Sequence, residues 1–212
     1  MYAMTSFENN PLLDLSDVPR WAEIRPEHVA FAMQTTLARA RQAMNVVEHL
    51  DEQAVNWDNF VEYLNNAVEA LSRVWGVVTH LHHVVDNEQW RAAYNEFLPQ
   101  VTEFWTELGQ NERILAHYQT LAKEPMFSSL TPTRQRIVTN ALRDFALSGA
   151  LLQGAARAEY AQLASEAAQL QAKFSENVLD ATNAYAYYAR HDELTGMPED
   201  NVIAMREAAA AD

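Results

Sequence analysis

The chain has 212 residues, a formal net charge of −14, 49% hydrophobic residues and no cysteine. The lack of cysteine excludes a disulfide framework, a cysteine-ligated zinc site and a thiol nucleophile. The negative charge argues against a nucleic-acid partner. No apolar run approaches the ~18 residues of a membrane span, and residues 1–30 lack a signal-peptide pattern. We therefore expect a cytoplasmic protein without a membrane partner, and its five glycines favour long helices.

The first elements predicted along the chain are an extended arm and two helices. Residues 1–24 contain two prolines and no helical period. Pro26 suits a first helical turn, and apolar residues recur every three or four positions from there to about Leu50. Asn56 or Asp58 can cap a second helix. That helix is apolar on two sides, so we expect it to be the most buried element.

Three more helices are predicted in the middle of the chain. The third helix begins near Asn87, and Pro99 inside it predicts a kink or a break. Gly109 is a plausible stop, and a shorter helix over 111–123 follows. Thr131 precedes a proline and is expected to cap the next helix.

The last third of the chain contains the longest periodic stretch. Its apolar side chains step by three or four and predict a narrow seam for antiparallel packing: Tyr160, Leu163, Ala167, Leu170, Phe174, Val178 and Ala181. Residues near 185–190 alternate and are tyrosine-rich, which indicates a short strand or extended segment. Residues 198–212 predict a last helix that is cut short.

These elements predict one all-α domain over residues 1–212. The arm is 1–24, the main helices lie within 25–184, and the truncated helix is 198–212. The expected architecture is an antiparallel, bundle-like array of about six or seven helices.

Three histidines cluster in the second predicted helix, at His80, His82 and His83, with Asp86 following within one turn. On a helix His80 and His83 are neighbours, and imidazole is the commonest metal ligand. His80, His83 and Asp86 are therefore a candidate metal cluster. A structural role is the stronger alternative, because His82 falls on the apolar stripe of the helix and His80 lies beside its second apolar row.

Motifs of known enzyme classes are missing from the sequence. It contains no His-Glu-x-x-His of helical zinc peptidases and no Glu-x-x-His pair of di-iron bundles. It also lacks a phosphate-binding Gly-x-x-x-x-Gly-Lys and a Gly-x-Ser-x-Gly nucleophile motif. We therefore assign no catalytic residue and no metal ligand beyond the candidate cluster.

Two other features of the sequence are candidates for a site that binds a partner. No basic residue occurs between Arg41 and Arg73, where six acidic side chains form a strip that can attract a cationic partner or be a solvated face: Glu48, Asp51, Glu52, Asp58, Glu62 and Glu69. Tryptophans can line a peptide cleft, but the helical spacing of Trp75, Trp90 and Trp105 favours a place in the core.

Several stretches are more specific than helical periodicity requires. They are NPLL at 10–13, IRPEHV at 24–29, THL at 79–81, ELGQNE at 107–112, NALRDF at 140–145, LSG at 147–149 and FSENVLDATNA at 174–184. In this order and spacing they resemble the N-terminal region of the thimet oligopeptidase family of zinc metallopeptidases, over nearly the whole chain. His82 stands where the family tends to carry asparagine, so the histidine cluster is not a feature of the family.

The resemblance implies an almost entirely helical enzyme with two lobes around a deep channel that admits short peptides. Its zinc and the His-Glu-x-x-His motif would lie outside this chain, which would supply channel wall and no chemistry. The implied partners are short peptides and the missing C-terminal catalytic region, and a dimer through an exposed surface is also expected. The alternative is a standalone helical interaction module without peptidase activity.

Overall fold

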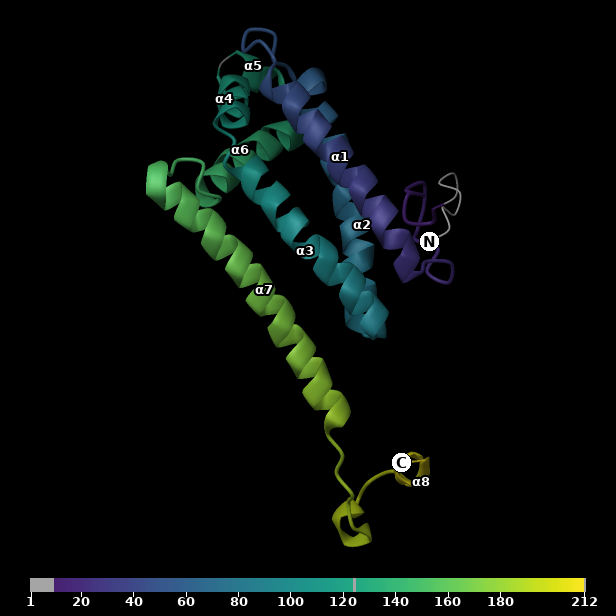
Figure 1. The fold of residues 1–212 in the computed structure, drawn as a ribbon. Coiled ribbons are helices and arrows are strands. Elements are labelled where there is room, and N and C mark those ends of the chain that lie inside the picture. Colours follow the sequence, from purple (N-terminus) through teal and green to yellow (C-terminus); the bar gives the residue numbers. More distant parts are fainter. Residues whose placement is uncertain (1–9, 124, 212) are drawn as a thin grey trace, which may run out of the picture. The chain divides into compact units, whose positions relative to one another are not determined.

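The computed structural model describes residues 10–123 and 125–211, and its regular elements there are all helical (Figure 1). The all-α prediction is therefore confirmed. The chain divides into two compact units, Met1–Ala172 and Lys173–Asp212, which are described separately. Among the described helices, none combines the length and the apolar character that a membrane span requires.

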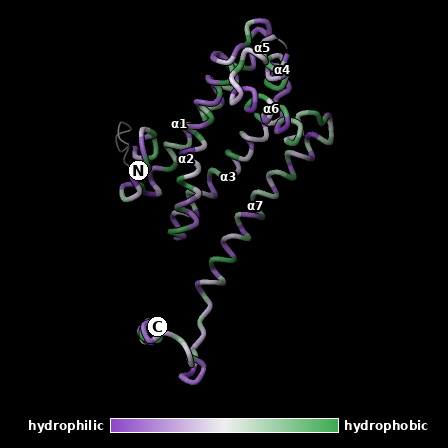
Figure 2. Tube along the Cα trace, turned by 180° about the vertical axis from the view of Figure 1, so that it is seen from behind, coloured by the Kyte–Doolittle hydropathy of each residue, from purple (hydrophilic) through white to green (hydrophobic). Residues whose placement is uncertain are grey.

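Three long helices form the main layer of the first unit. The short turn η2 (Pro26–His28) leads into α1 (Val29–Glu48), which packs along α2 (Tyr63–Val85), and both contact α3 (Glu88–Gly109). Hydrophobic and hydrophilic residues alternate along each of these helices (Figure 2). Their shared core includes Met33, Leu37, Leu71, Val74, Trp90, Phe97, Val101 and Phe104.

A second core lies where the end of α1 and the start of α2 meet the shorter helices. The π-helical turn η3 (Trp57–Glu62) meets α4 (Glu112–Leu121), α5 (Met126–Ser129) and α6 (Pro132–Leu147) there. Its buried residues include Val47, Val55, Phe60, Leu64, Ile114, Tyr118, Leu121, Val138 and Phe145.

Side-chain caps fix where these helices begin, and the sequence predicted those at Asn56 and Thr131. Asn56 accepts hydrogen bonds from the backbone N–H groups of Asp58 and Asn59, and Asn87 does the same for Trp90. Asn111 caps α4, and Thr131 caps α6. Each cap satisfies a backbone donor that the first helical turn leaves without a partner.

One prediction about the helices is wrong, and a second is wrong in part. The predicted second helix corresponds to η3 and α2, which together bury eight residues, the same number as α1 alone, so it is not the most buried element. Its second apolar side is partly covered, because Val74 and Leu81 are buried whereas Val84 is 60% exposed. Of the kink or break predicted at Pro99, the break is not found, because α3 continues through the proline. The neighbouring core contacts of Phe97 and Val101 hold the helix together there.

The predicted N-terminal arm is irregular where the structure describes it, and its residues 1–9 lie outside the described part. In the second unit, the end of α7 (Gly154–Ala184) is followed by η4 (His191–Leu194) and α8 (Glu199–Ala211); Asp212 is again not described. Residues 185–190 form neither helix nor strand. The strand alternative predicted there is not found, because a strand needs a neighbouring strand and the described residues contain none.

Two helical glycines provide a matched pair for a stability test. A Cβ on Gly109, the last residue of α3, would lie 2.6 Å from the Cβ of Ser148, whereas a Cβ on Gly76 in α2 would meet no atom within 4 Å. We expect Gly109→Ala to lower the free energy of unfolding by about 1–3 kcal/mol. Gly76→Ala should raise it by up to about 1 kcal/mol, because alanine favours the helix. Urea denaturation measures both, and equal effects would contradict the close contact between Gly109 and Ser148.

Candidate functional site

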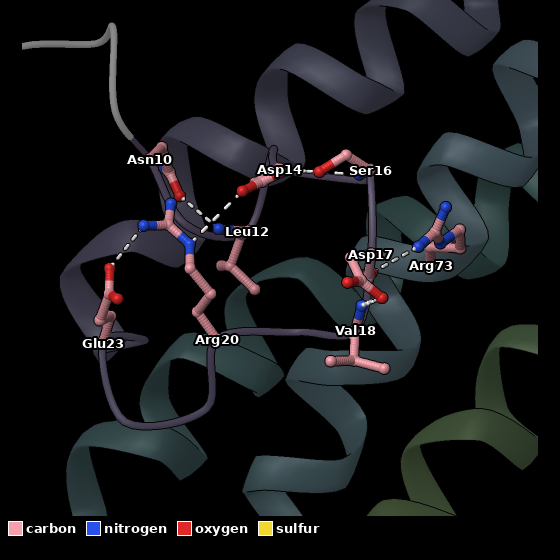
Figure 3. Close-up of polar contacts among 9 residues, drawn as sticks. All are labelled: Asn10, Leu12, Asp14, Ser16, Asp17, Val18, Arg20, Glu23 and Arg73. Atoms are coloured by element: carbon pink, nitrogen blue, oxygen red, sulfur yellow. Dashed lines mark hydrogen bonds and ion pairs between the residues drawn. The ribbon is translucent and has the colours of Figure 1, made fainter.

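The N-terminal arm is held against α2 by polar contacts (Figure 3). Arg73 donates hydrogen bonds to the backbone carbonyls of Leu15 at 2.6 Å and Asp17 at 3.1 Å. Asn10 donates to the carbonyl of His28 at 2.9 Å and accepts from the N–H of Leu12 at 3.0 Å. The arm is thus a tethered part of the first unit, and the NPLL stretch has a structural role.

The three candidate metal ligands at the end of α2 each make contacts with other residues. The His80 ring lies 5.1 Å from the ring of Trp21, and the Nδ1 atom of His83 is 2.7 Å from the carbonyl oxygen of Thr79. Asp86 accepts two hydrogen bonds from Arg91, at 2.7 and 2.8 Å. These bonds hold the pKa of Asp86 below its ordinary value.

No three His, Asp or Glu side chains among residues 10–123 and 125–211 are grouped so that they could hold a metal ion. Metal binding by His80, His83 and Asp86 stays a prediction, and it would require Asp86 to leave Arg91. His82 is fully buried with its ring stacked on Tyr94 at 4.2 Å. This position suits a packing role for His82.

The acidic strip between Arg41 and Arg73 is largely in solvent. Asp51, Glu52, Asp58 and Glu69 are all exposed, and Glu62 has a long ion pair of 3.9 Å with Arg134. Exposed charges of this kind are screened by salt. The strip thus resembles a solvated face more closely than a built site.

One of the three tryptophans expected in the core lies at a groove. Trp90 is buried, and Trp75 stacks on Tyr94 with ring centroids 4.7 Å apart. Trp105 is 38% exposed and lines a groove of about 300 Å³ between α2, α3, α4 and α6, which also includes Tyr118 and Asp144. The core prediction is therefore wrong for Trp105, because α6 reaches the end of α3 without covering the indole.

Hydrogen bonds tie the start of α7 to a corner between α3 and α4. Arg157 of α7 donates to the side-chain oxygens of Glu112 at 2.5 Å and Gln110 at 3.3 Å. It also donates to the backbone carbonyl of Gln110. Reasoning from helical periodicity missed these contacts. The signal for them was the ELGQNE stretch at 107–112, which is too specific to be explained by helix packing alone.

The apolar seam predicted along α7 is exposed from Leu163 to Ala181, and only its first member, Tyr160, is partly buried. In the first unit, the partly buried side of the helix carries small residues instead: Ala161, Ser165, Ala168 and Ala172. Ala161 and Ser165 line a groove of about 500 Å³ beside α3, whose wall there includes Glu103 and Thr106. Leu163 is 57% and Leu170 62% exposed. The expectation of antiparallel packing through this seam is therefore wrong for the described residues, because α7 packs through its small side.

We name Leu163, Ala167 and Leu170 the α7 apolar row. All three are exposed on one side of the helix. Within the second unit, Phe174 is 69% and Val178 48% exposed. Large apolar side chains in a repeat of three and four are costly to leave in water, and such a repeat is typical of a helix that packs on another element.

The Tyr118 hydroxyl gives a prediction for alkaline pH. Burial raises the pKa of Tyr118 to about 12, above its ordinary value of about 10. The unfolded chain therefore loses this proton first, and the free energy of unfolding should fall by about 2–3 kcal/mol between pH 10 and 12. Tyr118→Phe should abolish this loss, whereas Tyr63→Phe, at a tyrosine that is 45% exposed, should leave it in place. Urea denaturation across this pH range measures the difference, and equal behaviour of the two variants would contradict it.

The α3–α4 corner lies in a region of the chain that matches a known protein family. Residues 24–157 match the family model for the N-terminal domain of neurolysin and thimet oligopeptidase. The chain is 34% identical over 204 residues to oligopeptidase A of Salmonella typhimurium and 31% identical over 202 residues to that of Haemophilus influenzae. Each of these alignments covers 95% of this chain.

A plant protein, the probable cytosolic oligopeptidase A of Arabidopsis thaliana, is 31% identical over the whole chain. The alignments cover 30%, 29% and 30% of the Salmonella, Haemophilus and Arabidopsis proteins, so the chain spans about three tenths of the length of these relatives. The matched region includes the tethered α2, the α3–α4 corner and the first residues of α7. The chain belongs to the neurolysin and thimet oligopeptidase family, and it corresponds to the N-terminal region of oligopeptidase A.

Proposed function

We propose that this chain is the N-terminal helical portion of a cytoplasmic zinc metallo-oligopeptidase that hydrolyses short peptides. The observation that carries the proposal is the family match over residues 24–157, together with relatives about three times as long as the chain. The portion would form part of the lobe that borders the substrate channel. Its role is then to limit the size of the substrate, without supplying a catalytic group.

Zinc is proposed to bind outside this chain. The residues that the structure describes offer no group of three metal-binding side chains, and Asp86 is engaged by Arg91. These residues do not fit a zinc site. We therefore derive no step of the reaction from them, and we expect the isolated chain to be inactive.

The exposure of the α7 apolar row is a second observation that supports the proposal. Its leucines are 57% and 62% exposed, as expected for a helix whose partner belongs to another part of the protein. We propose that the C-terminal catalytic region covers this row. A standalone interaction module is the alternative function, in which a separate protein or a second copy would cover it.

The gene and the peptidase activity test the proposal together. We expect the reading frame to continue past the codon for Asp212 and to encode His-Glu-x-x-His. The longer protein should cleave a short peptide, lose activity with a chelator and regain it with zinc, whereas the isolated chain should do none of these. A stop codon directly after Asp212 would support the interaction module, and zinc-dependent cleavage by the isolated chain would contradict the assignment of the chemistry.

A charge in the α7 apolar row tests the proposed interface. In the longer protein, Leu170→Lys should lower the free energy of unfolding by about 2–4 kcal/mol, because it buries an unpaired charge. In the isolated chain the effect should be within about 0.5 kcal/mol, as for other surface changes. Gln169→Lys adds the same charge at the neighbouring exposed position and is the control. Equal effects of Leu170→Lys in both proteins would show that the row is not covered.

A further inference from the structure

Residues 185–190 of the second unit combine a strand-forming sequence with a backbone that has no strand partner. Tyrosine and alanine alternate over residues 184–187, another tyrosine and an alanine follow, and tyrosine favours strands. The backbone groups of Ala186, Tyr187 and Ala189 make no hydrogen bond among the described residues. Unpaired N–H and C=O groups such as those of Ala186, Tyr187 and Ala189 can serve as a template for another strand.

Both ends of this segment are fixed, so its backbone is already held in place. The N–H of Tyr185 donates to the carbonyl of Thr182 at 3.3 Å, at the end of α7. Glu193 in η4 accepts from the N–H of Arg190 at 2.8 Å and from the Tyr187 hydroxyl at 3.0 Å. A segment anchored at both ends loses less conformational freedom when a partner pairs with it.

An open groove lies beside the segment. It has a volume of about 700 Å³, and Ala186 and Tyr187 line one part of it, while Val202, Met205 and Ala209 of α8 line another. The groove therefore offers backbone groups for pairing and apolar side chains for packing. The tyrosines beside it are strongly exposed, 75% at Tyr185 and 63% at Tyr187. Exposed aromatic rings next to the unpaired backbone groups of Ala186, Tyr187 and Ala189 are a suitable surface for strand addition.

We propose that residues 185–190 become a β-strand by pairing with a strand of the C-terminal region of the protein, which lies in this groove. The proposal rests on the proposed function, because its partner belongs to the part of the protein that extends beyond this chain. The relatives provide the length for it, since the chain spans about three tenths of them. A second copy of this chain is the competing occupant, and the test separates the two.

Hydrogen exchange on the longer protein tests this pairing. An edge strand with one partner directs every second N–H toward that partner. We therefore expect either the amide of Ala186 or the amides of Tyr187 and Ala189 to exchange at least about 100-fold more slowly in the longer protein than in the isolated chain. The amides of Val74 and Val78 in α2 are the folding control and should be protected in both proteins. Equal, fast exchange throughout 186–189 in the longer protein would overturn the proposal.

Proline substitutions give an independent readout of the same pattern. Ala186→Pro and Tyr187→Pro remove neighbouring N–H groups, so only the one whose N–H points to the partner should lower the melting temperature of the longer protein strongly. Tyr187→Phe is the control, because it keeps the backbone N–H of residue 187 and removes only the hydrogen bond from the side chain to Glu193. Equal effects of the two prolines would count against a strand.

The outcomes separate this inference from the proposed function. An active, zinc-dependent longer protein with unprotected amides at 186–189 would overturn the strand alone, whereas a stop codon after Asp212 would overturn both. Protection that appears in the isolated chain and rises with its concentration would identify a second copy as the occupant, and would also overturn the proposal.

Discussion

The corner between α3 and α4 is the constraint on which the later part of the first unit depends. Gly109 lets α3 end against Ser148, at the end of α6, with no room for a Cβ between them. One residue later, Gln110 is bound by Arg157 at the start of α7. These two contacts hold the end of α6 and the first turn of α7 against the corner. A methyl group at position 109 would disturb the first contact, and a shorter cation at position 157 would disturb the second.

The same corner explains why α7 exposes its large apolar side chains. Once Arg157 fixes the first turn, the helical period brings Ala161, Ser165, Ala168 and Ala172 to one side and the leucines to another. Small residues allow the close approach of two helices. The leucines therefore remain free for a partner, and a partner that belongs to the same polypeptide would make this arrangement stable.

Local features of the sequence predicted the helices well. Asn87 and Asn111 cap the helices that follow them, and Gly109 ends α3, because each acts on backbone groups only a few residues away. The prediction was wrong where the result depends on distant parts of the chain. Periodicity shows that Leu163 and Leu170 share a side of α7, but it cannot say whether any element covers that side. Trp105 is a second example, since only the path of α6 leaves its indole exposed.

The secondary structure of the tyrosine-rich segment at 185–190 also depends on distant parts of the protein. A helix satisfies its own backbone, so a sequence can specify it locally. A strand obtains its hydrogen bonds from another strand, which can come from any part of the protein. The alternation of tyrosine and alanine therefore predicts a capacity to pair, and the chain shows an irregular segment while that capacity is unused. A strand signal without a strand then indicates where a partner of this protein should be sought.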